Sequence, residues 1–237
     1  MRKKRKLLSA GSLVLIAVAA LLLIGSSVGS TRATLTYYSD NYKAQIEVSD
    51  IDVALLENGK ETGETLLTHL QKEKGGFLPG KAYTEELSVQ NTGSIDSYVR
   101  VILKKSWLDP DQKKDTSLSP KLIDVHFPEG SGWVVDQTAS TPERTVLYYT
   151  GVVKSGETTP SLSDTLKVDS SIITKVEEKK DGNQVTYEYK YDGYTCFLEA
   201  EVDAVQTHNA EAAIKSAWGV NVSVGADGTL SLQEVQP

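Results

Sequence analysis

The chain has 237 residues, of which 25 are basic and 32 are acidic, for a net charge of −7 at pH 7. Residues 1–33 hold six of the basic residues and no acidic one, so the rest of the chain has 19 basic against 32 acidic residues, a net charge of −13. A surface this acidic repels nucleic acid and anionic lipid, and excludes both as partners of the chain beyond residue 33. The remaining length suits a single domain.

The first predicted element is an export signal. Residues 2–6 are all basic, and an uncharged apolar run follows over residues 7–24. Basic residues stay on the cytoplasmic side while the apolar run enters the membrane, so the pattern predicts a secreted, extracellular or cell-surface protein. An apolar run of this length also leaves a retained membrane anchor as an alternative.

Small residues after the apolar run favour cleavage by signal peptidase. A cut after Ala33 has small side chains at the two positions that the enzyme reads, and a cut after Thr36 would leave Tyr37 as the new N-terminus. We therefore expect a signal peptide within residues 1–36 and one domain over residues 37–237. The chain would then meet the membrane only through its signal segment, before cleavage.

An extended segment follows the cleavage region. Tyr42, Ala44, Ile46 and Val48 alternate with polar residues, which is the period of a β-strand. Such a strand either pairs within its own sheet or adds to the exposed sheet edge of another molecule.

The rest of the chain predicts a mainly β fold. Period-two patterns recur, and turn signals such as Asn-Thr-Gly and Asp-Gly separate them. The predicted strands cover residues 86–90, 98–103, 146–149, 185–191, 194–205 and 220–224. Short strands at this spacing favour an antiparallel β-sandwich.

One helix is predicted near the C-terminus. It covers residues 210–218, with Thr207 or Asn209 as the N-cap and Gly219 as the stop. Ile214 and Trp218 lie four residues apart, as do Ala213 and Ala217, so this face is expected to cover the sheet. Two polar stretches, residues 109–120 and 137–144, predict surface loops.

The two faces of the predicted strand over residues 194–205 carry different kinds of side chain. Cys196, the only cysteine, falls on its apolar face and is expected to be a small core residue, because a lone cysteine cannot form an internal disulfide. Glu199, Glu201 and Asp203 form a row on the other face. That row is expected to face solvent, with a cation site or a glycosidase acid as alternatives.

The sequence shows no catalytic motif. His69, His126 and His208 are scattered, without the spacing of a zinc motif, and no serine sits in a nucleophile elbow. We therefore predict no catalytic residue, no metal site and no cofactor.

Several blocks of the chain resemble the exported TasA/camelysin family of Gram-positive bacteria. The family has an aromatic-aromatic-Ser-Asp box after its signal, a hydrophobic strand ending in Leu-x-Glu, and a Leu-x-Pro-Gly block paired with an Asn-x-Gly-Ser block. The similar stretches here are residues 36–42, 51–57, 78–81, 87–94, 98–101, 148–162 and 201–209. This chain has Thr36 where the family has alanine at its cleavage point.

The resemblance implies a jelly-roll sandwich and, for TasA, a biofilm-matrix fibre. Subunits of such fibres exchange donor strands, so the expected partners are further copies of the chain and other matrix proteins. The donor here would be the segment from Tyr42 to Val48. A camelysin-like secreted metallopeptidase is one alternative, although the sequence offers no ligand set for it. A surface module that binds a glycan or a host protein through tyrosines is another.

Overall fold

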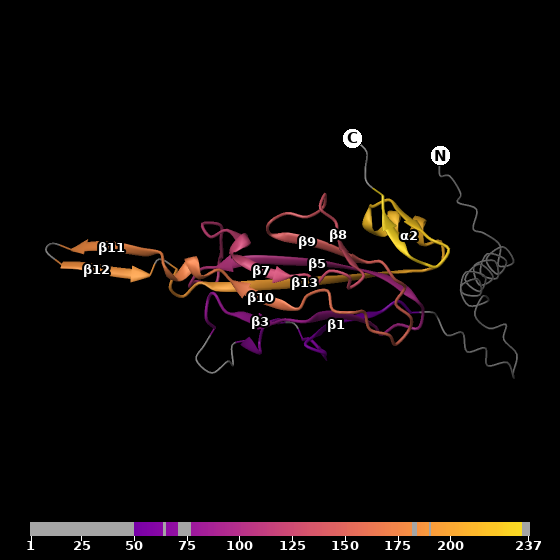
Figure 1. Cartoon of the computed structure of the whole chain (residues 1–237), viewed down its shortest axis with the longest axis horizontal. Helices are drawn as coiled ribbons and strands as arrows, with labels where there is room; N and C mark the ends of the chain where they lie inside the picture. The colour runs from indigo at the N-terminus through magenta and orange to yellow at the C-terminus, as the bar shows by residue number, and fades with distance from the viewer. Residues whose placement is uncertain (1–49, 64, 71–76, 182–183, 190, 234–237) are drawn as a thin grey trace, which may run out of the picture. The chain divides into compact units, whose positions relative to one another are not determined.

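The computed structural model describes residues 50–63, 65–70, 77–181, 184–189 and 191–233, which belong to one compact unit, Val48–Pro237 (Figure 1). The predicted signal peptide, its cleavage region and the extended segment lie outside the described residues. These positions include Ala33, Thr36, Tyr37, Tyr42, Ala44, Ile46 and Val48.

The described residues form mainly antiparallel strands with one short α-helix near the C-terminus, which confirms the predicted fold class. The main elements, in chain order, are β1 (Val53–Glu57), β2 (Lys60–Glu61), β3 (Ala82–Thr84), β4 (Leu87–Asn91), β5 (Ser97–Leu108), β6 (Lys114–Asp115), β7 (Ile123–His126), β8 (Trp133–Val135), β9 (Arg144–Tyr149), β10 (Thr165–Val168), β11 (Val176–Asp181), β12 (Gln184–Tyr189), β13 (Thr195–Gln206), α2 (Ala210–Trp218), β14 (Val222–Val224) and β15 (Leu230–Leu232). Two 3₁₀ turns, η2 (Pro120–Leu122) and η3 (Ser170–Ile173), complete them.

The first layer of the sandwich combines two three-stranded sheets, β2-β1-β4 and β3-β10-β7. β3 and β4 follow each other in the chain, and the stretch 157–168 runs antiparallel beside both of them. Its backbone N–H groups at Thr159 and Leu162 donate to the carbonyls of Val89 and Leu87. β1 therefore lies on one side of this layer and β7 on the other.

The second layer is the sheet β13-β5-β9-β8, with the short β6 also paired to β5. β5 and β13 are each 12 residues long and pair over their whole length, from Thr195 opposite Leu108 to Gln206 opposite Ser97. β5 runs further than the predicted residues 98–103, because its ladder to β13 continues past the lysine pair at 104–105.

The main hydrophobic core lies between the two layers. Both layers contribute fully buried residues to it, which is the arrangement expected of a sandwich. Its largest buried side chains are Trp107, Leu87, Leu103, Leu118, Ile123, Leu147, Leu162 and Leu166.

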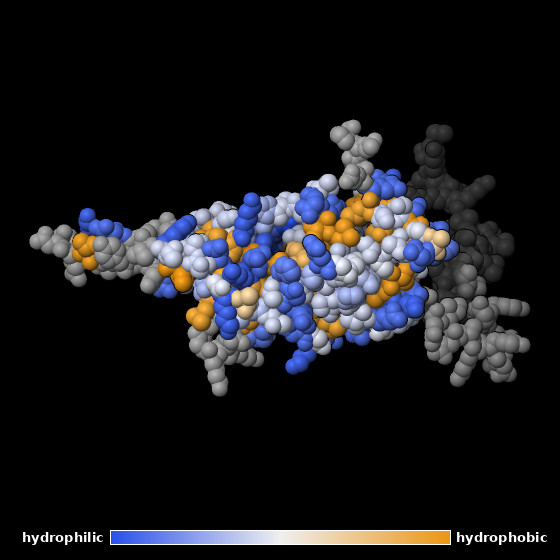
Figure 2. All heavy atoms as spheres, in the orientation of Figure 1, coloured by the Kyte–Doolittle hydropathy of each residue, from blue (hydrophilic) through white to orange (hydrophobic). Residues whose placement is uncertain are grey.

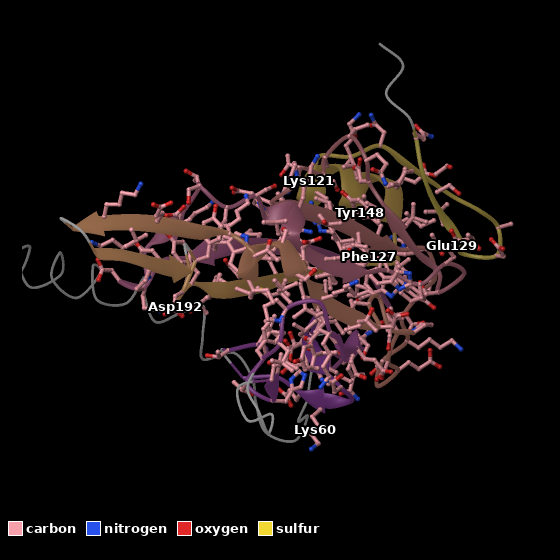
Figure 3. The ribbon with its side chains drawn as sticks, turned by 60° about the vertical axis from the view of Figure 1, so that its left-hand side comes forward. Lys60, Lys121, Phe127, Glu129, Tyr148 and Asp192 are labelled. Atoms are coloured by element: carbon pink, nitrogen blue, oxygen red, sulfur yellow. The ribbon has the colours of Figure 1, made fainter. Side chains whose placement is uncertain are left out.

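A second core lies on the opposite face of the β5–β9 sheet, under α2 and the β14–β15 hairpin. Tyr148, labelled in Figure 3, packs its ring 5.6 Å from that of Trp218, and Ile214 is completely buried. The helix therefore covers the sheet through Ile214 and Trp218, as the spacing predicts. Ala217, which was assigned to a covering face with Ala213, is exposed.

The ends of α2 agree with the sequence except for one hydrogen bond. The helix begins after Asn209 and ends at Gly219, whose left-handed φ of +75° suits glycine. The Asn209 side chain makes no capping hydrogen bond, because this residue itself adopts a left-handed conformation. The predicted N-cap position is thus right, whereas the expected side-chain capping is wrong.

The β11–β12 hairpin extends away from the two layers (Figure 1), and its strands pair from Val176 opposite Tyr189 to Asp181 opposite Gln184. Figure 2 shows hydrophilic side chains spread over the visible face of the sandwich, with apolar residues scattered between them.

Candidate functional site

The most unusual feature of the sandwich is the open edge of β13. On one side β13 pairs with β5 in continuous register, and on the other side no described strand pairs with it. An unpaired strand of this length presents a row of backbone N–H and C=O groups that can accept another strand.

A groove of about 650 Å³ runs along this edge, between β13 and β1 of the other layer. One wall is formed by residues 52–55, and a second by residues 195–200 of β13. Residues 61–63 and 65–67, which follow β1, form part of the rim. The groove therefore lies between the edge strands of the two layers.

The hollow continues towards α2. A further space of about 380 Å³ is lined by residues 51–53, by residues 202–204 of β13, and by Ala217 and Trp218 of the helix. Together the two hollows follow β13 along most of its length.

The face of β13 that borders the groove is the apolar one. Leu198 is buried, while Cys196, Ala200, Val202 and Ala204 are partly buried and pack against the main core. Partial burial of apolar side chains beside an open edge leaves contact surface for another apolar strand.

Cys196 has the place that the sequence predicts, on the apolar face, although it also lines the groove. Burial raises the pKa of its thiol to about 12. At neutral pH the group is therefore a protonated, unreactive thiol, and it acts as a small apolar residue.

The acidic row on the opposite face of β13 has basic partners. Lys104 Nζ lies 3.3 Å from Glu199 and 3.2 Å from Glu201, and Arg100 Nε donates to Asp203 at 2.9 Å. Because β5 supplies these cations, the row is a set of cross-strand ion pairs. The alternatives of a cation site or a glycosidase acid find no support in this geometry.

The chain enters the sandwich beside the groove. Asp50 receives a backbone hydrogen bond from Ser94, and Asp52 receives two, from Thr92 and Gly93. A Cβ atom at Gly93 would lie 2.5 Å from the Asp50 carbonyl oxygen, so only glycine permits this close approach. Residues 50–52 are thereby fixed against the turn after β4.

A second candidate site lies where β1 ends. Glu57, at the end of β1, His69, in the segment after β2, and Glu85, between β3 and β4, bring ligand atoms within 4.8 Å of one another. His69 Nδ1 is 3.6 Å from Glu57 Oε1, and His69 Nε2 is 3.4 Å from Glu85 Oε2. Such donors can hold a metal ion.

Backbone geometry brings the histidine to this place. Asn58-Gly59 forms the tight turn of the β1–β2 hairpin, with φ values of +50° and +74°, and Lys60 of β2 (labelled in Figure 3) is exposed beside it. Leu67 then adopts a φ of +64°, and its N–H donates to Glu57 Oε1 at 2.6 Å. Leu67 is also buried in the main core, so packing stabilises this uncommon conformation.

The carboxyl group of Glu85 is completely buried, and neither of its oxygens has a hydrogen-bond partner among the described residues. The pKa of Glu85 is raised to about 8, mainly because the group is buried and next because the Glu57 carboxylate lies nearby. At neutral pH this carboxyl group therefore holds its proton unless a cation replaces it.

The sequence missed this cluster. The other two histidines lie elsewhere: His126 Nδ1 is 2.8 Å from Asp164, and the carbonyl of His208 accepts from Gln206. His69 lies beside two glutamates that are 12 and 16 residues away in the sequence, in different segments of the chain. No motif spacing links the three residues.

No family model and no curated protein matches this chain. Within the described residues, no helix is both long enough and apolar enough to span a membrane.

Proposed function

We propose that this chain is a secreted, non-enzymatic structural protein of the cell surface or biofilm matrix, and that it assembles by donor-strand exchange. In this proposal, residues 37–49 of one copy fill the groove between β1 and β13 of the next copy. The observation that carries the proposal is the 12-residue β13, whose outer edge pairs with no described strand and lies beside a groove that receives the apolar side chains of Cys196, Leu198 and Ala200.

The dimensions of donor and groove support this pairing. The groove residues of β13 that face the core span Cys196 to Ala204, or about 26 Å of extended chain at about 3.3 Å per residue. Tyr42 to Val48 span about 20 Å on the same basis. Both series place an apolar side chain at every second residue, so a donor of this length fits within the groove.

The way in which the chain enters the sandwich favours a donor from another copy. Residues 50–52 are already hydrogen-bonded to the turn after β4. To fill its own groove, the segment before Asp50 would have to reverse within residues 46–49, which are Ile-Glu-Val-Ser. Apart from Ser49, this stretch has no residue that favours a tight turn.

The test is fibre formation by the exported protein, followed by sedimentation and negative-stain microscopy. Ile46→Pro removes a backbone N–H and fixes φ, so it is expected to abolish growth. Ile46→Val, the matched control, keeps an apolar β-branched residue and is expected to assemble. The net charge of −13 makes two copies repel each other. Salt screens this repulsion and lower pH reduces the charge, so either should promote assembly of the wild type.

Mixing the two proteins gives a sharper test. Ile46→Pro has a defective donor but an intact groove, so it should bind the free donor at a fibre end and cap it. A minor fraction of Ile46→Pro should therefore shorten wild-type fibres, whereas Ile46→Val should not. Wild-type protein that stays monomeric at every salt concentration and pH would refute the proposal. Unfolding of Ile46→Pro alone would make the segment an internal strand.

One observation favours a second candidate function, a secreted metallopeptidase, namely the cluster of Glu57, His69 and Glu85. Against it, Glu85 is fully buried and the Glu57 side chain is only 11 % exposed, which leaves a peptide little access to the carboxylates. Chelator-sensitive cleavage of casein by the purified protein, abolished by His69→Ala, would favour the peptidase.

A further inference from the structure

Within the described part of the chain, the Glu85 carboxyl group differs from other buried polar side chains because it has no hydrogen-bond partner. Other buried polar side chains there have partners: Ser163 Oγ donates to the Glu85 carbonyl at 2.7 Å, and Thr159 Oγ1 accepts from Val89 N at 3.0 Å. Only the two carboxyl oxygens of Glu85 are buried without a hydrogen bond among the described residues. A buried carboxylate without a partner is strongly unfavourable, so this group needs either a proton or a cation.

The neighbours of Glu85 are groups that can bind a metal ion. Among the described residues, the ion-pair partner found for Glu57 and Glu85 is His69, which is charged only when protonated, so the cluster consists of one imidazole and two carboxyl groups. Imidazole together with carboxylate oxygens suits zinc, manganese and iron, whereas calcium prefers six to eight oxygen ligands. The chemistry of the donors therefore indicates a divalent transition-metal ion.

The three ligand atoms lie close together, as binding of a single ion requires. Two ligand atoms about 2.1 Å from a tetrahedral ion lie about 3.4 Å apart. His69 Nδ1 is 3.6 Å from Glu57 Oε1, whereas it is the other ring nitrogen, Nε2, that lies 3.4 Å from Glu85 Oε2. One ligand atom from each of the three residues lies within 4.8 Å of the other two. Small side-chain rotations would bring them to coordination distance. The Thr84 carbonyl oxygen, 3.3 Å from His69 Nε2, can accept the Nε2 proton when Nδ1 binds the ion.

Access to the site comes from the side of His69. Its side chain is 37 % exposed, whereas those of Glu57 and Glu85 are 11 % and 0 % exposed. An ion can thus enter from solvent past the imidazole, and water can occupy its remaining coordination positions.

We propose that Glu57, His69 and Glu85 bind one divalent transition-metal ion of the zinc type, which fastens residues 65–70 to the end of β1 and to the β3–β4 connection. The ion supplies the positive charge that Glu85 lacks, and it joins three segments that are distant in sequence. Leu66 and Leu67 of the fastened segment also border the groove at β13. The site is independent of fibre formation and is tested on the monomer.

The test is calorimetric titration of the exported, untagged protein with Zn²⁺ near pH 7.5, after treatment with a chelator. We expect a stoichiometry near one and a higher melting temperature with the ion. His69→Ala should weaken binding at least about tenfold and remove the thermal shift. His126→Ala is the matched control, because it removes an exposed histidine that also lies beside a carboxylate, and it should bind as the wild type does.

Glu85→Gln guards against a folding defect, because it keeps the volume of the side chain while it removes the charge. With circular dichroism like that of the wild type, it too should lose at least about tenfold in affinity. Visible absorption of bound Co²⁺, present in the wild type and absent in His69→Ala, would support coordination by the imidazole. Three results would overturn the proposal: no stoichiometric binding, equal binding by wild type and His69→Ala, or full affinity in Glu85→Gln.

Discussion

Replacement of Glu85 by glutamine should stabilise the metal-free protein, and more so as the pH rises. In the unfolded chain this carboxyl group has its ordinary pKa of 4.5, whereas in the folded protein burial, together with Glu57, raises the pKa to about 8. Below pH 4.5 both states hold the proton, and Glu85 imposes no penalty. Between the two values the folded state binds a proton that the unfolded state has released, so stability falls as the pH rises.

The size of the effect follows from the two pKa values. Each pH unit across this range changes the free energy of unfolding by about 1.4 kcal/mol, so the penalty reaches about 3 kcal/mol at pH 7 and up to about 5 above pH 8. Glutamine has no proton to release, and its amide can donate to the Glu57 carboxylate. The difference in stability between variant and wild type should therefore be small at pH 4.5 and grow towards pH 8.

The assay is urea unfolding at pH 4.5, 6, 7 and 8 with a chelator present, since a bound ion would replace the proton. Glu86→Gln is the matched control, because Glu86 is the exposed neighbour in the chain. Its difference from wild type should stay within about 0.5 kcal/mol at each pH. If the advantage of Glu85→Gln grows by less than about 1 kcal/mol between pH 4.5 and 8, Glu85 does not bear an unfavourable buried charge and the reasoning fails.

Two further predictions concern Cys196 in β13 and Ile214 in α2. Cys196→Ala should lower the free energy of unfolding by about 1 kcal/mol and leave assembly intact; loss of oligomers in non-reducing gels would instead indicate a bridging thiol. Ile214→Ala removes a completely buried side chain of α2 and should lower the free energy of unfolding by about 2–4 kcal/mol, whereas Lys215→Ala, on the exposed face of the helix, should change it by less than about 0.5 kcal/mol.

Local patterns predicted the elements that depend on local physics. The alternation from Cys196 to Ala204 placed the apolar face of β13 correctly, because the two faces of a half-buried strand differ in polarity. The α2 helix was predicted to the residue, since Gly219 permits the left-handed C-terminal turn. Both predictions rest on side chains within one element.

The length of β5 and the partners of its lysine side chains were less predictable. β5 continues through Lys104 and Lys105, where two adjacent lysines interrupt the apolar alternation. Tertiary contacts account for the difference: Lys104 pairs with acidic residues of β13, and Lys105 Nζ donates to the Ile123 carbonyl. Neighbouring strands thus supply partners that a single strand pattern does not reveal.

The carboxylate–histidine cluster is a tertiary feature. Glu85 stands next to Glu86 in the sequence, at the start of a predicted strand, yet one side chain is buried and the other exposed. Asn58-Gly59 was a usable signal, because that dipeptide predicts the hairpin turn that ends β1 at Glu57. The approach of His69 depends on the left-handed conformation of Leu67, which no propensity predicts.

The form of the β13 edge bears on the choice between a monomer and an assembly. Proteins that remain monomeric protect edge strands with proline, a bulge, a short strand or a charge that points inward. β13 has none of these: it is 12 residues long, it contains no proline, and its pairing with β5 is continuous. Its acidic residues lie on the outer face and pair with cations of β5, so the face of β13 that points to the core is apolar. An edge in this state is suited to receive a strand, and residues 37–49 contain the one segment of matching alternation that lies outside the described sandwich.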